Sequence, residues 1–130
     1  MTIRIVSDST CDLPAALIRD YHITIVPMYI NIGSKTFRDG IDLSRQEFYE
    51  QLPNYTHHPT TAAPSPGLFR QVYEQLATEG ATEILSIHIS VKLSAVVDMA
   101  AQGAKETSTV PVTVFDSRQL SMGTGFQVLA

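Results

Sequence analysis

The chain has 130 residues, a formal net charge of −4, and a composition that is 44% hydrophobic and 17% charged. This length suits one globular domain with its own core, so we expect residues 1–130 to form a single domain. The acidic balance excludes the basic surface that nucleic-acid binding requires, and every apolar run is too short to cross a bilayer. We therefore expect no nucleic-acid partner and no integral membrane segment.

The chain begins MTIRIVSDST, which contains no basic segment followed by an apolar core and a cleavage site, as a secretory signal would. Cys11 is the one cysteine, so the chain cannot form an internal disulfide. Proteins without disulfides are typical of reducing compartments. These features together predict a cytoplasmic protein.

Short segments that are nearly continuous in apolar and β-branched residues have the composition of strands. They are residues 3–6, 23–32, 83–89 and 110–115. Such segments lack the polar alternation of a half-exposed strand, which is typical of a sheet covered on both faces. The segment 23–32 contains Pro27, and we predict that it forms one buried strand.

Helical signals lie between these strands. Asp12 precedes the stretch 13–21, and Pro14 stands in its first turn, where a missing N–H costs little. We therefore predict that Asp12 caps a helix there. Ser44 and Glu47 have the spacing of a capping box, in which each side chain satisfies the other residue's backbone N–H. This pair predicts a second helix.

Further elements follow from turn residues and apolar spacing. The stretch 31–40 is rich in turn residues and predicts a small hairpin. Ser65 and Gly80 are placed to open and to close a third helix. Its apolar residues share one helical face: Leu68, Phe69, Val72, Tyr73 and Leu76. The last apolar residues, from Phe126 onward, predict a final helix.

Strand and helix alternate along the chain, and this order predicts an α/β fold with a mainly parallel sheet and helices on both faces. Ligands of open parallel sheets bind beyond the carboxyl ends of the strands, because loops and helix N-termini meet there. Hydroxyl side chains are frequent at the predicted strand exits 7–10, 90–94 and 116–121, and in the pair Thr60 and Thr61, which we also expect in a loop. The sequence thus predicts Ser and Thr hydroxyls gathered at one edge of the sheet.

Neutral hydroxyl donors with few cations suit a carboxylate or a carbonyl group better than a polyphosphate. Lys92 and Arg118 are the only basic residues at these strand exits. The glycines form neither a P-loop nor a dinucleotide fingerprint, so we predict no nucleotide cofactor. The adjacent His57 and His58 would point apart on an extended loop, which argues against a metal site. Ser, Thr and Asp at strand ends are also ordinary caps and turn formers, so a purely structural role stays open.

Five segments resemble, in order and spacing, the N-terminal part of the DegV family of fatty-acid-binding proteins. They are IVSDSTCDLP (5–14), ITIVPMYINIGSKTFRDGIDLSRQEFYEQL (23–52), PTTAAPSPGLF (59–69), ILSIHISVKLSA (84–95) and VFDSRQLSMGTG (114–125). The resemblance covers nearly the whole chain. It implies a DegV-like α/β domain followed by a second domain, so residues 1–130 are expected to be the N-terminal part of a longer two-domain protein.

The resemblance also implies a function. DegV-like proteins hold a long-chain fatty acid, such as palmitate or oleate, with its tail buried and its carboxylate hydrogen-bonded by hydroxyls. They are lipid-binding proteins rather than enzymes, and some serve as the lipid-carrying, non-catalytic subunit of a fatty-acid kinase. Carried over by position, the carboxylate donors are Thr61 and Ser94, with Thr60 as a weaker neighbour. The bound fatty acid would be the ligand, and no cofactor or metal is implied.

Two other functions remain open from the residues. A phosphotransfer domain could use His57, His58 or His88 as its phosphoryl acceptor. A small hydrolase could use Ser9 or Cys11 as its nucleophile, although the sequence shows no complete catalytic triad.

Overall fold

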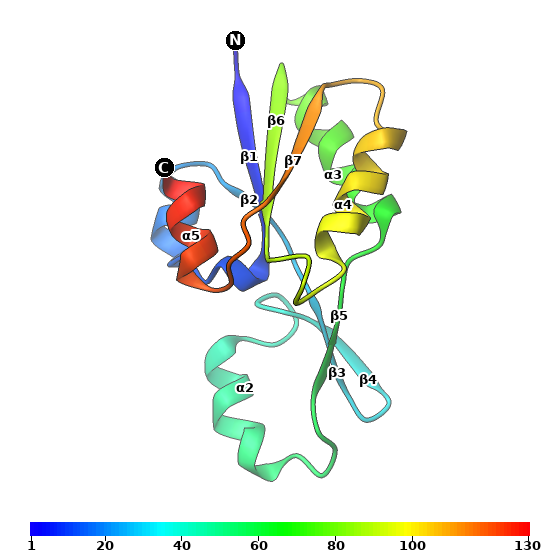
Figure 1. Cartoon of the computed structure of the whole chain (residues 1–130). Helices are drawn as coiled ribbons and strands as arrows, with labels where there is room; N and C mark the ends of the chain where they lie inside the picture. Colours follow the sequence, from blue (N-terminus) through cyan, green and yellow to red (C-terminus); the bar gives the residue numbers. More distant parts are fainter.

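A computed structural model describes residues 1–130. Its main sheet has parallel strands in the order β2-β1-β6-β7. In chain order these are β1 (Ile3–Asp8), β2 (Thr24–Val26), β6 (Glu83–His88) and β7 (Val112–Asp116). Figure 1 shows β1, β6 and β7 side by side in the upper part of the fold. The prediction of a mainly parallel sheet is confirmed.

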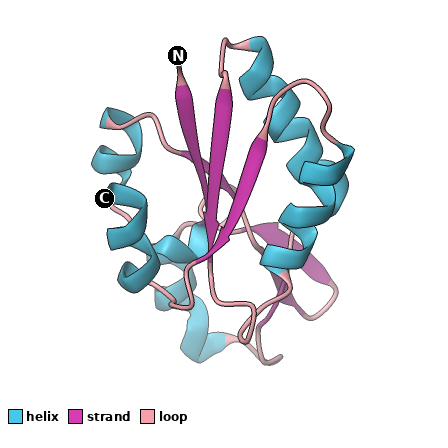
Figure 2. Ribbon diagram, turned by 45° about the horizontal axis from the view of Figure 1, so that its top comes forward, coloured by secondary structure: helices cyan, strands magenta, loops and turns pink.

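Helices cover both faces of the main sheet (Figure 1, Figure 2). α1 (Ala15–Asp20) and α5 (Met122–Leu129) pack on one face, whereas α3 (Pro66–Thr78) and α4 (Val96–Glu106) pack on the other. This arrangement confirms the predicted α/β fold with helices on both faces. None of these helices is long and apolar enough to cross a membrane.

The main sheet separates two apolar cores, because neighbouring residues of a strand point to opposite faces. Ile84 of β6 packs into the core beside α3 and α4, and Leu85 packs against the core beside α1 and α5. The larger core includes Val6, Phe69, Tyr73, Val96 and Ala100. The smaller core consists of Cys11, Leu13, Ile23, Ile87 and Val128.

A second, antiparallel sheet lies beyond the carboxyl ends of the main strands (Figure 1). Its strands, in the order β4-β3-β5, are β3 (Tyr29–Ile32), β4 (Lys35–Arg38) and β5 (Thr60–Ala62). β3 and β4 form the predicted hairpin. Between β4 and β5 the chain forms α2 (Arg45–Gln51) and the short 3-10 helix η2 (Leu52–Asn54).

Residues 23–32 do not form one strand, so the prediction of a single buried strand is wrong. Pro27 has no N–H to donate to a strand ladder, and β2 ends directly before it. The N–H of Met28 instead donates to the hydroxyl of Ser9 at 3.0 Å, in the 3-10 helix η1 (Ser9–Cys11). The chain then leaves the main sheet and enters the second one as β3.

The prediction of a loop at Thr60 and Thr61 is also wrong, because both residues lie in β5. Thr61 pairs with Ile30 and Thr60 pairs with Asn31 across the second sheet. This pairing joins segments that are distant in sequence, and β5 is only three residues long, so no local pattern reveals it.

Asp12 does not cap α1, contrary to the prediction. Its backbone is left-handed, with a φ of 56°, and Pro14 occupies the position before the helix. The carboxylate of Asp12 instead accepts hydrogen bonds from Arg45 and from Ser121. A tertiary ion pair has therefore replaced the local capping bond.

The other helix ends agree with the sequence. The hydroxyl of Ser44 accepts the N–H of Glu47, and that of Ser65 accepts the N–H of Leu68, each at 3.1 Å. α3 ends just before Gly80, whose φ of 102° suits a residue without a side chain. The predicted final helix is present as α5.

Candidate functional site

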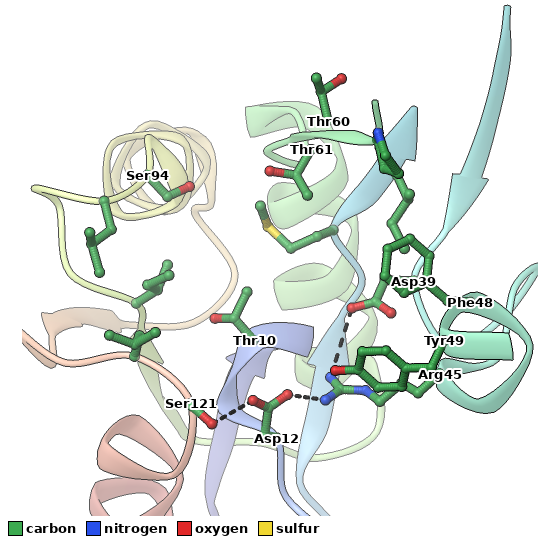
Figure 3. Close-up of a pocket in the computed structure, with 16 residues that line it drawn as sticks. Thr10, Asp12, Asp39, Arg45, Phe48, Tyr49, Thr60, Thr61, Ser94 and Ser121 are labelled. Carbon is green, nitrogen blue, oxygen red and sulfur yellow. Dashed lines mark hydrogen bonds and ion pairs between the residues drawn. The ribbon is translucent and has the colours of Figure 1, made fainter. Parts of the chain in front are cut away.

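A cavity of about 370 Å³ lies between the carboxyl edge of the main sheet and the second sheet with α2 (Figure 3). We call it the main cavity. Its polar lining comes from Thr10, Asp12, Asp39, Arg45, Thr60, Thr61, Ser94 and Ser121. Its apolar lining includes Met28, Ile30, Phe48, Ile89, Leu93 and Leu120. A cavity of this size, mostly apolar with a few polar groups, is typical of a small-molecule site.

The structure brings one hydroxyl residue from each predicted strand exit into the lining of the main cavity. Thr10 follows β1, Ser94 follows β6, and Ser121 follows β7. β5 of the second sheet lines the same cavity opposite those exits, and Thr60 and Thr61 both belong to the lining. Whether Thr61, Ser94 and Thr60 hold a ligand carboxylate stays a prediction.

The two threonines of β5 differ in direction, because adjacent residues of a strand point to opposite faces. Figure 3 shows the hydroxyl of Thr61 pointing into the main cavity toward Ser94, whereas Thr60 points away from it. The oxygen of Ser94 accepts the N–H of Val96 at 3.4 Å, which leaves the Ser94 proton free to donate to a ligand. Thr61 and Ser94 are therefore arranged as a pair of facing donors.

Thr10 has the opposite hydrogen-bonding character. Both its backbone N–H and its hydroxyl donate to the carboxylate of Asp8. Burial tends to raise the pKa of Asp8, but hydrogen bonds from His88 and Thr10 hold that pKa below its ordinary value. Since Asp8 is a carboxylate and can only accept, Thr10 presents an acceptor oxygen to the main cavity.

Sequence reasoning missed the charged end of the main cavity. Arg45 of α2 pairs with Asp12, and its guanidinium lies 3.8 Å from Asp39. Ser121 donates to Asp12 at 2.5 Å. Burial opposes the charge of Arg45, but its bonds with Asp12 and the nearby Asp39 raise its pKa. No local signal indicates this cluster, because Arg45 stands 33 positions from Asp12 in the sequence.

A second polar network lies wholly inside the larger core. His88 Nδ1 lies 2.9 Å from Asp8 Oδ2, and His88 Nε2 lies 2.6 Å from the hydroxyl of Ser86. The hydroxyl of Tyr73 donates to Ser86 at 2.8 Å. Asp8, His88 and Ser86 thus have the connectivity of a catalytic triad, yet all three are fully buried. No substrate can reach them, so the network is structural.

The hydrolase alternative finds no support in the structure. The hydroxyl of Ser9 accepts the N–H of Met28 and is buried. Burial raises the pKa of the Cys11 thiol, which disfavours the reactive thiolate. Neither residue lines the main cavity.

The phosphotransfer alternative is not favoured either. His88 is fully buried and both of its ring nitrogens are engaged. His57 and His58 are exposed in the loop before β5 and do not line the main cavity. The structure also contains no group of three or more His, Cys, Asp or Glu side chains arranged to hold a metal ion.

Comparisons with known proteins relate the whole chain to one family. The sequence model described as "Uncharacterised protein, DegV family" matches residues 2–130. A DegV domain-containing protein from Deinococcus radiodurans is 40% identical over 129 residues, which are 99% of this chain and 45% of that protein. A DegV domain-containing protein from Streptomyces coelicolor is 36% identical, over 98% of this chain and 45% of its own length. The chain thus spans less than half the length of these relatives.

Solved structures agree with the sequence relatives. A DegV family protein from Thermus thermophilus, described for its fatty-acid binding, is 39% identical with a TM-score of 0.88, over 99% of this chain and 45% of its own. DegV from Bacillus subtilis, described as a fatty acid binding protein, is 29% identical with a TM-score of 0.93 over the same shares. Because the family's sequence model and these relatives match along nearly its whole length, the chain belongs to the DegV family.

Proposed function

We propose that this protein binds a long-chain fatty acid, such as palmitate or oleate, at the main cavity. Thr61 and Ser94 would donate to its carboxylate, with Thr60 as a weaker neighbour. The observation that carries the proposal is the geometry of Thr61 in β5 and Ser94 in the segment between β6 and α4, which face each other across a largely apolar cavity. The Thermus and Bacillus relatives, both described as binding fatty acids, support the same ligand class.

The two parts of such a ligand would be bound by different forces. Each hydrogen bond to the charged carboxylate would contribute about 1.5–3 kcal/mol. Each methylene buried against Met28, Ile30, Ile89 and Leu93 would contribute about 0.8 kcal/mol. The tail would therefore supply most of the affinity, and the hydroxyls would set the orientation.

We further propose a role as the non-catalytic, lipid-carrying partner of a fatty-acid kinase. The donors proposed for the ligand headgroup are the neutral hydroxyls of Thr61 and Ser94, and such donors suit a carboxylate better than a polyphosphate. The chain spans 45% of its relatives, which supports a longer protein whose N-terminal domain is residues 1–130. A reducing, cytoplasmic location fits its one free, buried cysteine, Cys11.

The test is to purify the full-length protein, extract it with organic solvent, and identify bound lipid by mass spectrometry. We expect a long-chain fatty acid in a near-stoichiometric amount. Absence of any such acid, together with no rise in melting temperature on adding palmitate or oleate, would refute the proposal.

The donor assignment is tested by variants of the same protein. Thr61→Val with Ser94→Ala removes both hydroxyls at little change in volume and should lower fatty-acid occupancy. Thr60→Val should lower it less, because Thr60 points away from the cavity. Thr113→Val, on β7 and outside the cavity lining, is the matched control. Equal occupancy in all four proteins would contradict the assignment of Thr61 and Ser94.

A further inference from the structure

A second cavity, of about 470 Å³, lies next to the main cavity. The two cavities share the side chains of Asp12, Asp39 and Arg45. The remaining lining of the second cavity is largely apolar and includes Cys11, Leu13, Ile18, Ile25 and Ile41. The ion cluster around Arg45 is thus the wall between the two cavities.

Arg45 is held in this wall from several sides. Its guanidinium bonds the carboxylate of Asp12 and the backbone carbonyl of Ser9, and it lies 3.8 Å from Asp39. Asp12 is held in turn by the hydroxyl of Ser121, and both of these residues have a positive φ. Strained backbone that is retained around a cavity is typical of functional positions.

The charge of this wall indicates how an elongated acid would lie in the main cavity. Two carboxylates, Asp12 and Asp39, face one guanidinium, so the wall carries a formal charge of −1. A ligand carboxylate is repelled there, and the acceptor oxygen of Thr10 offers it no proton. Figure 3 shows Thr61 and Ser94 at the end of the cavity opposite Asp12 and Arg45. The apolar end of the ligand would therefore point toward Arg45.

From this arrangement we propose that Arg45 sets the length of acyl chain that the protein accepts, by closing the main cavity against the second one. The inference rests on the proposed fatty-acid binding. A chain that fits the main cavity ends at the aliphatic part of the Arg45 side chain, which packs well against a methyl end. A longer chain would have to displace Arg45 from Asp12 to enter the second cavity.

The test compares the full-length protein with Arg45→Ala and Arg45→Met. Affinities for laurate, palmitate, stearate and arachidate are measured by competition with a fluorescent fatty acid. In Arg45→Ala the second cavity opens, so affinity for the longest acids should rise relative to palmitate, by about tenfold for each two further methylenes buried. Arg45→Met refills much of the gap with an uncharged side chain, so its chain-length preference should shift less than that of Arg45→Ala. Arg38→Ala, which removes an arginine paired with Asp42 outside both cavities, is the control.

Two outcomes would overturn the inference. One is an Arg45→Ala protein with the chain-length profile of wild type, and the other is an Arg45→Met protein shifted as far as Arg45→Ala. Both are distinct from failure of the proposed function, in which the wild-type protein itself would bind none of the four acids. Circular dichroism of each variant checks that the fold is retained.

Discussion

Asp8 and His88 are 80 positions apart in the sequence, yet His88 Nδ1 lies 2.9 Å from Asp8 Oδ2 and neither side chain is exposed. The parallel pairing of β1 with β6 creates this contact. Asp8 also accepts the N–H of Ile89 at 3.2 Å, and its other oxygen bonds Thr10. Because Thr10 and Ile89 both line the main cavity, the buried pair holds part of the cavity wall in place.

Replacing Asp8 should show how much this pair stabilises the fold. Asp8→Asn keeps the volume but replaces the charged acceptor of the hydrogen bonds from His88, Thr10 and Ile89 by a neutral amide, and we expect a loss of about 3 kcal/mol in the free energy of unfolding. Urea denaturation at neutral pH measures it. A loss below about 0.5 kcal/mol, the range of an ordinary surface substitution, would contradict the structural role of Asp8.

The carboxylate of Asp8 should also make the stability of the folded protein depend on pH. The pKa of Asp8 in the folded protein lies below its ordinary value, so its ionised form stabilises the native state. This stabilisation is complete above the unfolded pKa of about 3.9 and is lost as the pH falls through the lower native value. The urea midpoint of the wild-type protein should therefore fall on acidification, and the midpoint of Asp8→Asn should fall less. An equal fall in the midpoints of both proteins with pH would contradict the prediction.

Tyr73 provides a separate test of the buried network. Burial raises the pKa of Tyr73 to about 12, and its hydroxyl donates to Ser86. Tyr73→Phe removes this bond from a closed environment and should cost about 1–2 kcal/mol of stability. Tyr21→Phe changes an exposed ring and should stay within about 0.5 kcal/mol of wild type. Ultraviolet titration of the wild type should show one tyrosine that ionises with a pKa of about 12.

Gly103 is required where α4 crosses α3. A Cβ atom at this position would lie 2.7 Å from Phe69 Cβ and 2.8 Å from the carbonyl oxygen of Pro66. Gly103→Ala must therefore push the helices apart, and we expect a loss of about 1–3 kcal/mol. Gly67→Ala in α3 meets only Ser65 Oγ at 3.9 Å and should be neutral or stabilising by up to about 1 kcal/mol. Thermal unfolding compares the two variants, and a Gly103→Ala protein as stable as Gly67→Ala would contradict the close packing.

Much of the fold follows from short-range patterns that the sequence itself carries. The apolar spacing of α3, with Ser65 at its start and Gly80 after its end, needs no distant partner to be recognised. The continuous apolar strands β1 and β6 predict a sheet covered on both faces. That Thr10, Ser94 and Ser121 share one cavity also follows, because parallel strands bring their carboxyl ends to one edge.

The tertiary structure alone decided the rest. The division of residues 23–32 between two sheets, and the pairing of Thr61 with Ile30, depend on partners far along the chain. The ion cluster of Arg45 and Asp12 arises only once α2 lies over the strand exits. The favourable free energy of these long-range contacts comes from burial and charge interactions that no short segment contains. The packing of the whole chain therefore selects them.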